Sequence, residues 1–123
     1  MQNAQLKSAP DKIWDLKRNK RIGEIYLEIG DIENAQKTYL SLINNHPKTP
    51  GGYIGLADCY ERKGDIQKAI EYQERAIIIV KTTYEYIPKI SFKKELQKLA
   101  DLYKKSGQQD LADKVAQEIA SIK

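Results

Sequence analysis

Cys59 and His46, the only cysteine and the only histidine of this 123-residue chain, are its natural candidates for a nucleophile and its base. A thiol acts as a nucleophile only with a base within reach, and a metal ion needs several ligands at once. Cys59 falls on an apolar helical stripe beside Tyr60, where we expect an inert, buried thiol, and His46 belongs to a turn in another element. Gly51-Gly52 is expected in an ordinary loop rather than in a phosphate-binding one. We therefore expect no enzyme activity, no cofactor and no metal site.

Charge is the other chemistry that the sequence offers, and it is unevenly distributed. The net charge is +4, but residues 1–21 hold six Lys/Arg against two Asp, and residues 89–105 hold six Lys against one Glu and one Asp. Such segments are typical of solvated helix faces, and they can also attract an acidic partner. Nucleic acid is not expected as a partner, because 21 basic residues face 17 acidic ones and the tyrosines recur at core spacing rather than between lysines.

The length and composition are those of one soluble domain, with 41% hydrophobic and 31% charged residues. No run approaches the ~18–20 apolar residues of a membrane span, and the first residues have no apolar signal core. A single cysteine excludes an internal disulfide framework and suits a reducing compartment. We expect a cytoplasmic protein that makes no membrane contact.

One segment recurs along the chain at a fixed distance. Residues 26–35 read YLEIGDIENA and residues 60–69 read YERKGDIQKA, so the tyrosine, the Gly-Asp-Ile and the alanine all recur 34 residues later. A third copy, with Tyr103, Gly107 and Ala112, lies 43 residues beyond the second and has a glutamine in place of the aspartate. A repeat of this length indicates stacked supersecondary units rather than a compact enzyme fold.

Each Gly-Asp pair predicts a tight turn between two antiparallel helices. The glycine ends one helix in the left-handed conformation, which costs a residue with a Cβ ~1–2 kcal/mol, and the aspartate caps the next helix. Apolar residues follow a helical period, and the small Ala35, Ala69 and Ala112 stand where the paired helix must come close. No useful stretch alternates with period two, so we expect an all-α fold. The six expected helices cover about residues 10–29, 32–45, 53–63, 66–86, 91–106 and 109–122.

These features resemble the tetratricopeptide repeat family. The first two units match its pattern best, with Tyr53 in place of a frequent tryptophan, and the third is degenerate. The matching positions are Ile22-Gly23, Tyr26, Gly30-Asp31, Ala35, Tyr39 and Pro47, then Leu56-Ala57, Tyr60, Gly64-Asp65, Ala69 and Ala76, then Leu99-Ala100, Tyr103, Gly107 and Ala112. The resemblance implies a single domain over residues 1–123, a right-handed solenoid of three stacked antiparallel helix hairpins.

The repeats are expected at about residues 16–49, 50–83 and 93–123, with an extension of the second repeat to residue 92. Nine additional residues precede the third unit, no proline stands near Lys81, and Pro88 provides the next stop. The fourth helix is therefore expected to run on to about Tyr84–Ile87.

The resemblance also implies that the first helix of each hairpin lines a concave groove for peptides or helices of other proteins. We therefore expect a scaffold or adaptor for protein–protein interaction, with a protein or peptide partner whose acidic residues are attracted by the lysines. The expected groove residues are Lys17, Lys20, Arg21, Glu24, Asp58, Arg62, Lys94, Lys98 and Asp101.

Some family members clamp a C-terminal carboxylate between lysines and asparagines in this groove. Lys20, Lys94 and Lys98 occupy positive positions of such a clamp. Glu24 and Gly55 stand where the two asparagines would be, and Glu24 would repel a carboxylate. The sequence therefore departs from the family pattern that this specific function requires.

Apolar residues keep a second function open, an oligomerisation module that self-associates through the solenoid ends or through the Ile77–Phe92 region. Ala76–Val80 has four β-branched residues in a row, which cannot all face one side of a helix. Burial on two sides, between the second and third units, is favoured; the alternative is an exposed strip continued by Tyr84, Tyr86, Ile87 and Phe92. Trp14 is expected to pack against the open N-terminal end. The chain would be a monomer or a weak homo-oligomer.

Overall fold

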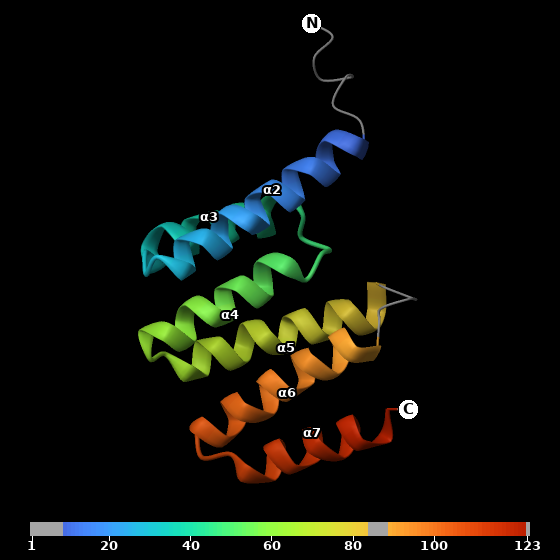
Figure 1. The fold of residues 1–123 in the computed structure, drawn as a ribbon. Coiled ribbons are helices and arrows are strands. Elements are labelled where there is room, and N and C mark those ends of the chain that lie inside the picture. Colours follow the sequence, from blue (N-terminus) through green and yellow to red (C-terminus); the bar gives the residue numbers. More distant parts are fainter. Residues whose placement is uncertain (1–8, 84–88, 123) are drawn as a thin grey trace, which may run out of the picture.

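Six helices form three antiparallel hairpins that stack in chain order (Figure 1). The computed structural model describes the backbone of residues 9–83 and 89–122 and the side chains of residues 13–82 and 91–122. The helices are α2 (Ala9–Glu28), α3 (Ile32–Asn45), α4 (Gly51–Lys63), α5 (Ile66–Thr83), α6 (Lys89–Lys105) and α7 (Gln109–Ser121). Each packs against the next along the chain, and α2 also packs against α4. The described residues contain no strand, and the predicted all-α solenoid is confirmed.

The three hairpin turns are built as the Gly-Asp pattern predicts. Gly30, Gly64 and Gly107 have φ angles of 83°, 86° and 80°, in the left-handed region that favours glycine. The Asp31 carboxylate accepts the backbone N–H of Asn34 at 3.2 Å, and the Asp65 carboxylate accepts that of Lys68 at the same distance. Gln108 caps α7 without a side-chain hydrogen bond, which agrees with the weaker third turn expected from the sequence.

The start of α4 corrects the expectation that Gly51-Gly52 belongs to a loop. The helix begins at Gly51, with Pro50 at its N-cap and the N–H of Ile54 bonded to the Pro50 carbonyl at 2.9 Å. A Cβ on Gly52 would lie 2.8 Å from a side-chain carbon of Ile43 and 3.0 Å from the Tyr39 carbonyl oxygen. Gly52 therefore allows α4 to start directly against α3.

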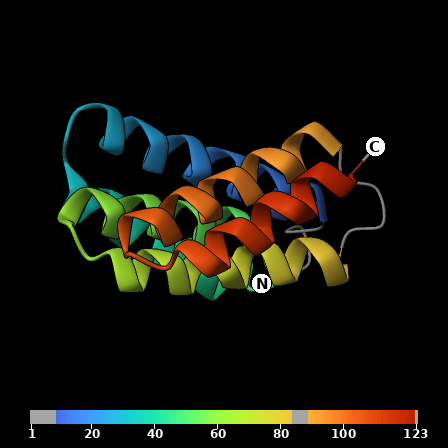
Figure 2. The same cartoon turned by 90° about the horizontal axis from the view of Figure 1, so that it is seen from below.

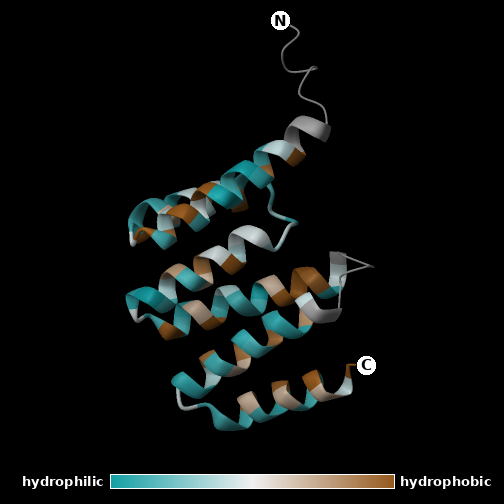
Figure 3. Cartoon of the chain, in the orientation of Figure 1, coloured by the Kyte–Doolittle hydropathy of each residue, from teal (hydrophilic) through white to brown (hydrophobic). Residues whose placement is uncertain are grey.

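The fourth helix, α5, continues past Lys81 to Thr83, and its expected end at Tyr84–Ile87 lies outside the described residues. The next helix, α6, starts at Lys89, two residues before its expected start at about Ser91. Figure 3 shows the hydrophobic end of α5 close to the start of α6.

Most of the segment Ala76–Val80 is buried, as the favoured interpretation expected, but its fully buried residues lie on one side of α5. Ala76, Ile77 and Val80 are buried, and Ile79 is half-buried. Ile78 differs, since 58% of it is exposed. The alternative is an exposed strip that continues from this segment to Phe92. Phe92 packs against the core, and Tyr84, Tyr86 and Ile87 lie outside the described residues.

Two apolar clusters fill the spaces between the hairpins. One joins the first two hairpins, and its buried members are Leu27, Ala35, Tyr39, Leu42, Leu56 and Cys59. The other joins the second and third hairpins around Leu96, Leu99 and Tyr103. Tyr60 contacts both clusters, so the stack is continuous. Ala35, Ala69 and Ala112 are buried, as expected for positions where two helices come close.

Trp14 does not pack against the N-terminal end of the stack, and that interpretation is wrong. Its side chain is 67% exposed, and the Lys17 ammonium lies 5.9 Å from the ring centroid. Asp15, the next residue, makes a contact with the first hairpin's second half instead. His46 Nε2 lies 2.8 Å from a carboxylate oxygen of Asp15, which joins α2 to the turn after α3.

Replacing Gly64 by valine is expected to destabilise the chain by ~1–2 kcal/mol or more, because a β-branched residue would have to adopt the left-handed conformation. A Cβ at this position would meet no heavy atom within 4 Å, so the backbone strain is the whole effect. Urea denaturation measures the change. Gly64→Asn is the control, since asparagine tolerates this conformation better. An equal loss in both variants would show that the backbone conformation is not the cause.

Asp15→Asn is expected to lower the stability near neutral pH but not in acid. The hydrogen bond with His46 is the main cause that lowers the pKa of Asp15, with smaller contributions from Arg18 and Asn19. A carboxylate whose pKa is lowered in the folded state stabilises the fold at pH values above its ordinary pKa of 3.8. This stabilisation is lost as the pH falls through the lowered pKa. The group is near the surface, so we expect less than ~1 kcal/mol.

Urea midpoints of the parent and Asp15→Asn, measured at pH 6 and below about pH 3, test this difference. Asp113→Asn, on the exposed side of α7, is the control for loss of a surface carboxylate. If the urea midpoints of the parent and Asp15→Asn differ as much in acid as at pH 6, the Asp15 carboxylate is not the source of the stabilisation.

Candidate functional site

The first helices of the three hairpins, α2, α4 and α6, share one side of the stack, which we call the front face. Figure 2 shows α2 and α6 in one layer and α5 in the other. Side chains link the front helices to one another. Arg62 of α4 donates to the backbone carbonyl of Leu27 of α2 at 3.1 Å. Lys98 of α6 lies 3.1 Å from the Asp58 carboxylate of α4, and a second ion pair joins Lys105 to Glu61.

The first of two clefts on the front face lies between α2 and α4 and has a volume of about 200 Å³. It brings together four of the predicted groove residues, Lys20, Glu24, Asp58 and Arg62. The other lining residues are Leu27, Glu28, Tyr39, Gly51, Ile54 and Gly55.

The second cleft adjoins α4 and α6 and has a volume of about 410 Å³. It contains the predicted groove residues Lys98 and Asp101 together with Glu61, Lys104 and Lys105. The ion pair between Asp58 and Lys98 stands between the two clefts, because Asp58 lines the first and Lys98 lines the second.

Three predicted groove residues, Lys17, Arg21 and Lys94, line neither cleft. Lys17 lies near the Trp14 ring, and Lys94 is exposed on α6. Arg21 forms ion pairs with Glu24 at 3.5 Å and with Glu28 at 3.2 Å. The free positive charge on α2 is therefore smaller than the sequence suggests.

Lys98 is also less available than predicted, because it contacts two carboxylates. In addition to Asp58, it lies 3.5 Å from Glu95 of its own helix. Burial raises the pKa of Asp58, and Lys98 offsets this only in part. Behind this pair, the Gln73 side-chain amide donates at 3.0 Å to both the backbone carbonyl and the carboxylate of Glu95. A chain of polar contacts thus joins α4, α6 and α5.

Tyr39 is a cleft residue that reasoning from the sequence did not assign to the site. It belongs to the rear helix α3, and its ring passes between two glycines of the front helices. An added Cβ would lie 2.5 Å from the Tyr39 Cζ at Gly23 and 2.2 Å from the ring atoms Cδ1 and Cε1 at Gly55. The sequence contains a signal for this position, the glycines at 23 and 55 on neighbouring front helices. That both lie against the Tyr39 ring depends on how the hairpins stack, which the sequence does not show.

The position of Tyr39 also explains the departure from a carboxylate clamp. Any side chain at Gly55, where the clamp would need an asparagine, would collide with the Tyr39 ring. Glu24, at the position of the other asparagine, lines the same cleft. The first cleft therefore lacks both amides of such a clamp.

Cys59 is buried, and burial raises the pKa of its thiol to about 11, with a further contribution from the neighbouring Asp58 carboxylate. The thiolate is therefore disfavoured at neutral pH. This confirms the prediction of a buried thiol on a core stripe.

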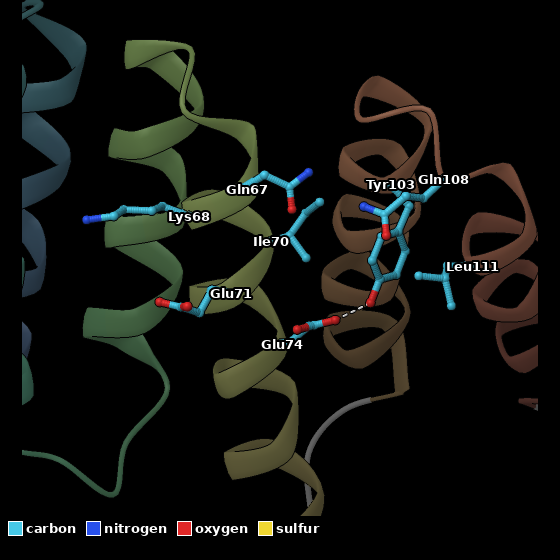
Figure 4. Close-up of a pocket in the computed structure, with 8 residues that line it drawn as sticks. All are labelled: Gln67, Lys68, Ile70, Glu71, Glu74, Tyr103, Gln108 and Leu111. Atoms are coloured by element: carbon cyan, nitrogen blue, oxygen red, sulfur yellow. Dashed lines mark hydrogen bonds between the residues drawn. The ribbon is translucent and has the colours of Figure 1, made fainter.

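A third cleft, of about 350 Å³, lies on the other side of the stack between α5 and the α6–α7 turn (Figure 4). The Tyr103 hydroxyl points toward Glu74 and donates a hydrogen bond to its carboxylate. Burial, then this carboxylate, raises the pKa of Tyr103. Lys68 points away from the tyrosine. Because Tyr103 already has a partner within the chain, this cleft offers fewer free polar groups than the first.

None of the helices within residues 9–83 and 89–122 combines the length and the apolar character needed to cross a membrane.

The stacked hairpins and the front-face clefts define a helical-repeat protein, and comparisons with known proteins give its family. Residues 21–49 and residues 51–77 each match a family model described as tetratricopeptide repeat. These segments of the chain are tetratricopeptide repeats, as the resemblance implied. The repeats mark it as a module for protein–protein interaction.

A TPR repeat-containing protein of Methanocaldococcus jannaschii is 33% identical over 55 residues. The match covers 45% of this chain and only 10% of that protein. It therefore supports the family and carries no conclusion about the function of the whole relative.

Solved structures confirm the fold at low sequence identity. The N-terminal domain of stress-induced protein-1 from C. elegans has a TM-score of 0.75 at 18% identity, with 86% of this chain and 82% of that chain covered. The second TPR domain of Spaghetti, bound to an HSP90 peptide, has a TM-score of 0.74 at 15% identity, with both chains fully covered.

Proposed function

We propose that this chain is a scaffold or adaptor that binds an extended peptide or a helix of a partner protein along its front face. The observation that supports this most directly is the pair of clefts, of about 200 and 410 Å³, on either side of the Asp58–Lys98 ion pair. A segment lying along the face could enter both. The Spaghetti domain of similar fold is bound to a peptide, which agrees with this use of the fold.

The charge on α6 favours acidic residues in the part of the partner that faces this helix. Lys98, Lys104 and Lys105 line the second cleft against Glu61 and Asp101, and Lys94 adds a further exposed charge on α6. Lys105 and Lys98 are partly neutralised by their own ion pairs, so Lys104 and Lys94 contribute most of the free charge. Exposed contacts of this type are worth ~0.2–1 kcal/mol each, and salt screens them.

The test is a double charge reversal in the clefts, Lys20→Glu with Lys104→Glu. These lysines line the first and second cleft, and neither is in an ion pair among the described side chains. The control, Lys37→Glu with Lys114→Glu, makes the same change in net charge on the exposed sides of α3 and α7. Lys98 is left intact because its reversal would place a third carboxylate beside Asp58 and Glu95.

A partner isolated with the parent chain is expected to bind the cleft variant about two- to thirtyfold more weakly, as for two lost contacts. It should bind the control variant as it binds the parent, and added salt should weaken its binding to the parent. Equal binding to all three proteins would show that the front face is not the site.

Self-association is a second candidate function, and the exposed apolar side chains of the first hairpin favour it. Three exposed apolar residues lie on one side of α2 and its C-terminal end: Trp14, Ile25 and Ile29. Their spacings of eleven and four residues correspond to nearly whole turns of an α-helix. A second copy of the chain could cover this surface through the N-terminal end of the stack. The Ile77–Phe92 region offers less, because Ile77 and Val80 are buried.

Sedimentation velocity over a range of concentrations tests this candidate. The parent is expected to show a concentration-dependent dimer, and Trp14→Lys with Ile25→Lys is expected to be monomeric. Ile78→Lys, at the exposed isoleucine of α5, should behave like the parent. A parent that is monomeric at every concentration, or a dimer that only Ile78→Lys dissociates, would contradict association through α2.

A further inference from the structure

Tyr39 combines an almost completely buried side chain with a hydroxyl group for which the described residues supply no hydrogen-bond partner. The residue is only 2% exposed, yet it lines the first cleft. No hydrogen bond of its hydroxyl is found among the described side chains. The Tyr39 hydroxyl is not among the fully buried side-chain atoms without a partner, so it is accessible from the cleft, and a purely structural role at this position would require only the ring.

The geometry directs this hydroxyl to the floor of the cleft. The side chain starts on the rear helix α3 and passes between Gly23 of α2 and Gly55 of α4. The carbon that bears the hydroxyl, Cζ, is among the ring atoms that approach both glycines most closely. The hydroxyl therefore emerges between the two front helices, where a bound segment would lie.

Hydrogen-bond acceptors outnumber cations among the side chains that line the cleft around the hydroxyl, although Arg21 pairs with Glu24 and Glu28 and Lys98 pairs with Asp58. Three carboxylates line the cleft, those of Glu24, Glu28 and Asp58, against two cations, Lys20 and Arg62. The Arg62 guanidinium is already bonded to the Leu27 carbonyl. Burial raises the pKa of Tyr39, and Glu24 and Asp58 raise it further against the opposing effect of Arg62.

Asp58 is a second acceptor on this side of the cleft. Its carboxylate is half-buried, and the Lys98 ammonium at 3.1 Å offsets only part of the effect of burial, which raises the pKa of Asp58. A second positive group on the cleft side of Asp58 would therefore be favourable. An anion placed there would face three carboxylates, those of Glu24, Glu28 and Asp58, which already occupy the neighbouring cations Arg21 and Lys98.

We propose that the cleft between α2 and α4 is a subsite for a lysine or arginine side chain of the partner, recognised by the Tyr39 hydroxyl oxygen together with the carboxylates of Glu24 and Asp58. This deepens the proposed function and rests on it, because the side chain belongs to a segment bound along the front face. A lysine ammonium has three donors and no acceptor, which matches three acceptors from three residues. Its aliphatic stem would lie on the apolar side chains of Leu27 and Ile54, which also line the cleft.

Three pools of seven-residue peptides provide the test. The central residue is lysine, glutamate or norleucine, and the other positions are mixed uncharged residues without cysteine. Norleucine keeps the apolar stem of lysine and removes the charge. Each pool is titrated into the isotopically labelled chain, and affinity is read from the NMR shifts of the Gly23 and Gly55 amides, which lie beside the Tyr39 ring.

The variants are Tyr39→Phe, which removes only the hydroxyl, and Glu24→Gln on the rim of the cleft. Tyr72→Phe and Glu71→Gln are the matched controls, since Tyr72 stacks on Tyr60 outside the cleft and Glu71 is exposed on α5. The thermal midpoint of Tyr39→Phe should equal that of the parent, because no hydrogen bond within the chain is lost. If Tyr39→Phe fails to fold, Glu24→Gln still gives the answer.

The lysine pool is expected to bind the parent about tenfold more tightly than the norleucine pool, and the glutamate pool least. Tyr39→Phe and Glu24→Gln should each reduce the lysine preference about three- to tenfold, and the controls should not. Binding without a lysine preference, or a preference that both variants keep, would overturn the subsite and leave the front-face proposal standing. Failure of every pool to bind would overturn both.

Discussion

The stack depends on the side chain that each rear helix inserts between two front helices. At the first junction this is Tyr39, whose ring fits only because residues 23 and 55 have no Cβ. At the corresponding position 34 residues later stands Gln73, whose amide donates to the backbone carbonyl and the carboxylate of Glu95. Both junctions contain an apolar cluster, to which the first adds a ring fitted between two glycines and the second adds the Gln73 hydrogen bonds.

This difference has an energetic consequence. Gln73 is completely buried, and its side-chain carbonyl oxygen has no hydrogen-bond partner among the described residues. An unsatisfied buried acceptor costs ~1–3 kcal/mol, whereas an aromatic ring packed between two glycines has no such cost. The second junction is thus expected to be the weaker one, and it is also the junction where the 34-residue spacing is broken.

Local physics made the helices and turns predictable from the sequence. Each hairpin turn requires a left-handed residue followed by a cap, and Gly30-Asp31 and Gly64-Asp65 supply both within two positions. The start of α4 was missed for the opposite reason. Gly51-Gly52 looks like a loop in isolation, and only the closeness of α3 explains why glycine is needed in a helix there.

The site was predictable only in outline, because its chemistry depends on contacts between hairpins. The front face follows from the repeat, and four predicted residues meet in the first cleft. The pairing of Lys98 with Asp58 could not be predicted, since it depends on the register of α6 after α5, which has 18 residues where α3 has 14. Tyr39 was visible as a repeat position, but its hydroxyl reaches the cleft only through the stacked glycines.

The resulting face has two different ends, and this bears on how a partner would lie on it. Carboxylates outnumber cations in the first cleft, and lysines outnumber carboxylates in the second. The Asp58–Lys98 pair separates the two regions and is itself neutral. A segment with a basic residue near one end and an acidic residue near the other would match both clefts in one direction only. In the reverse direction each charge would meet its own sign, so the same register that aligns α4 with α6 would also set the polarity of binding.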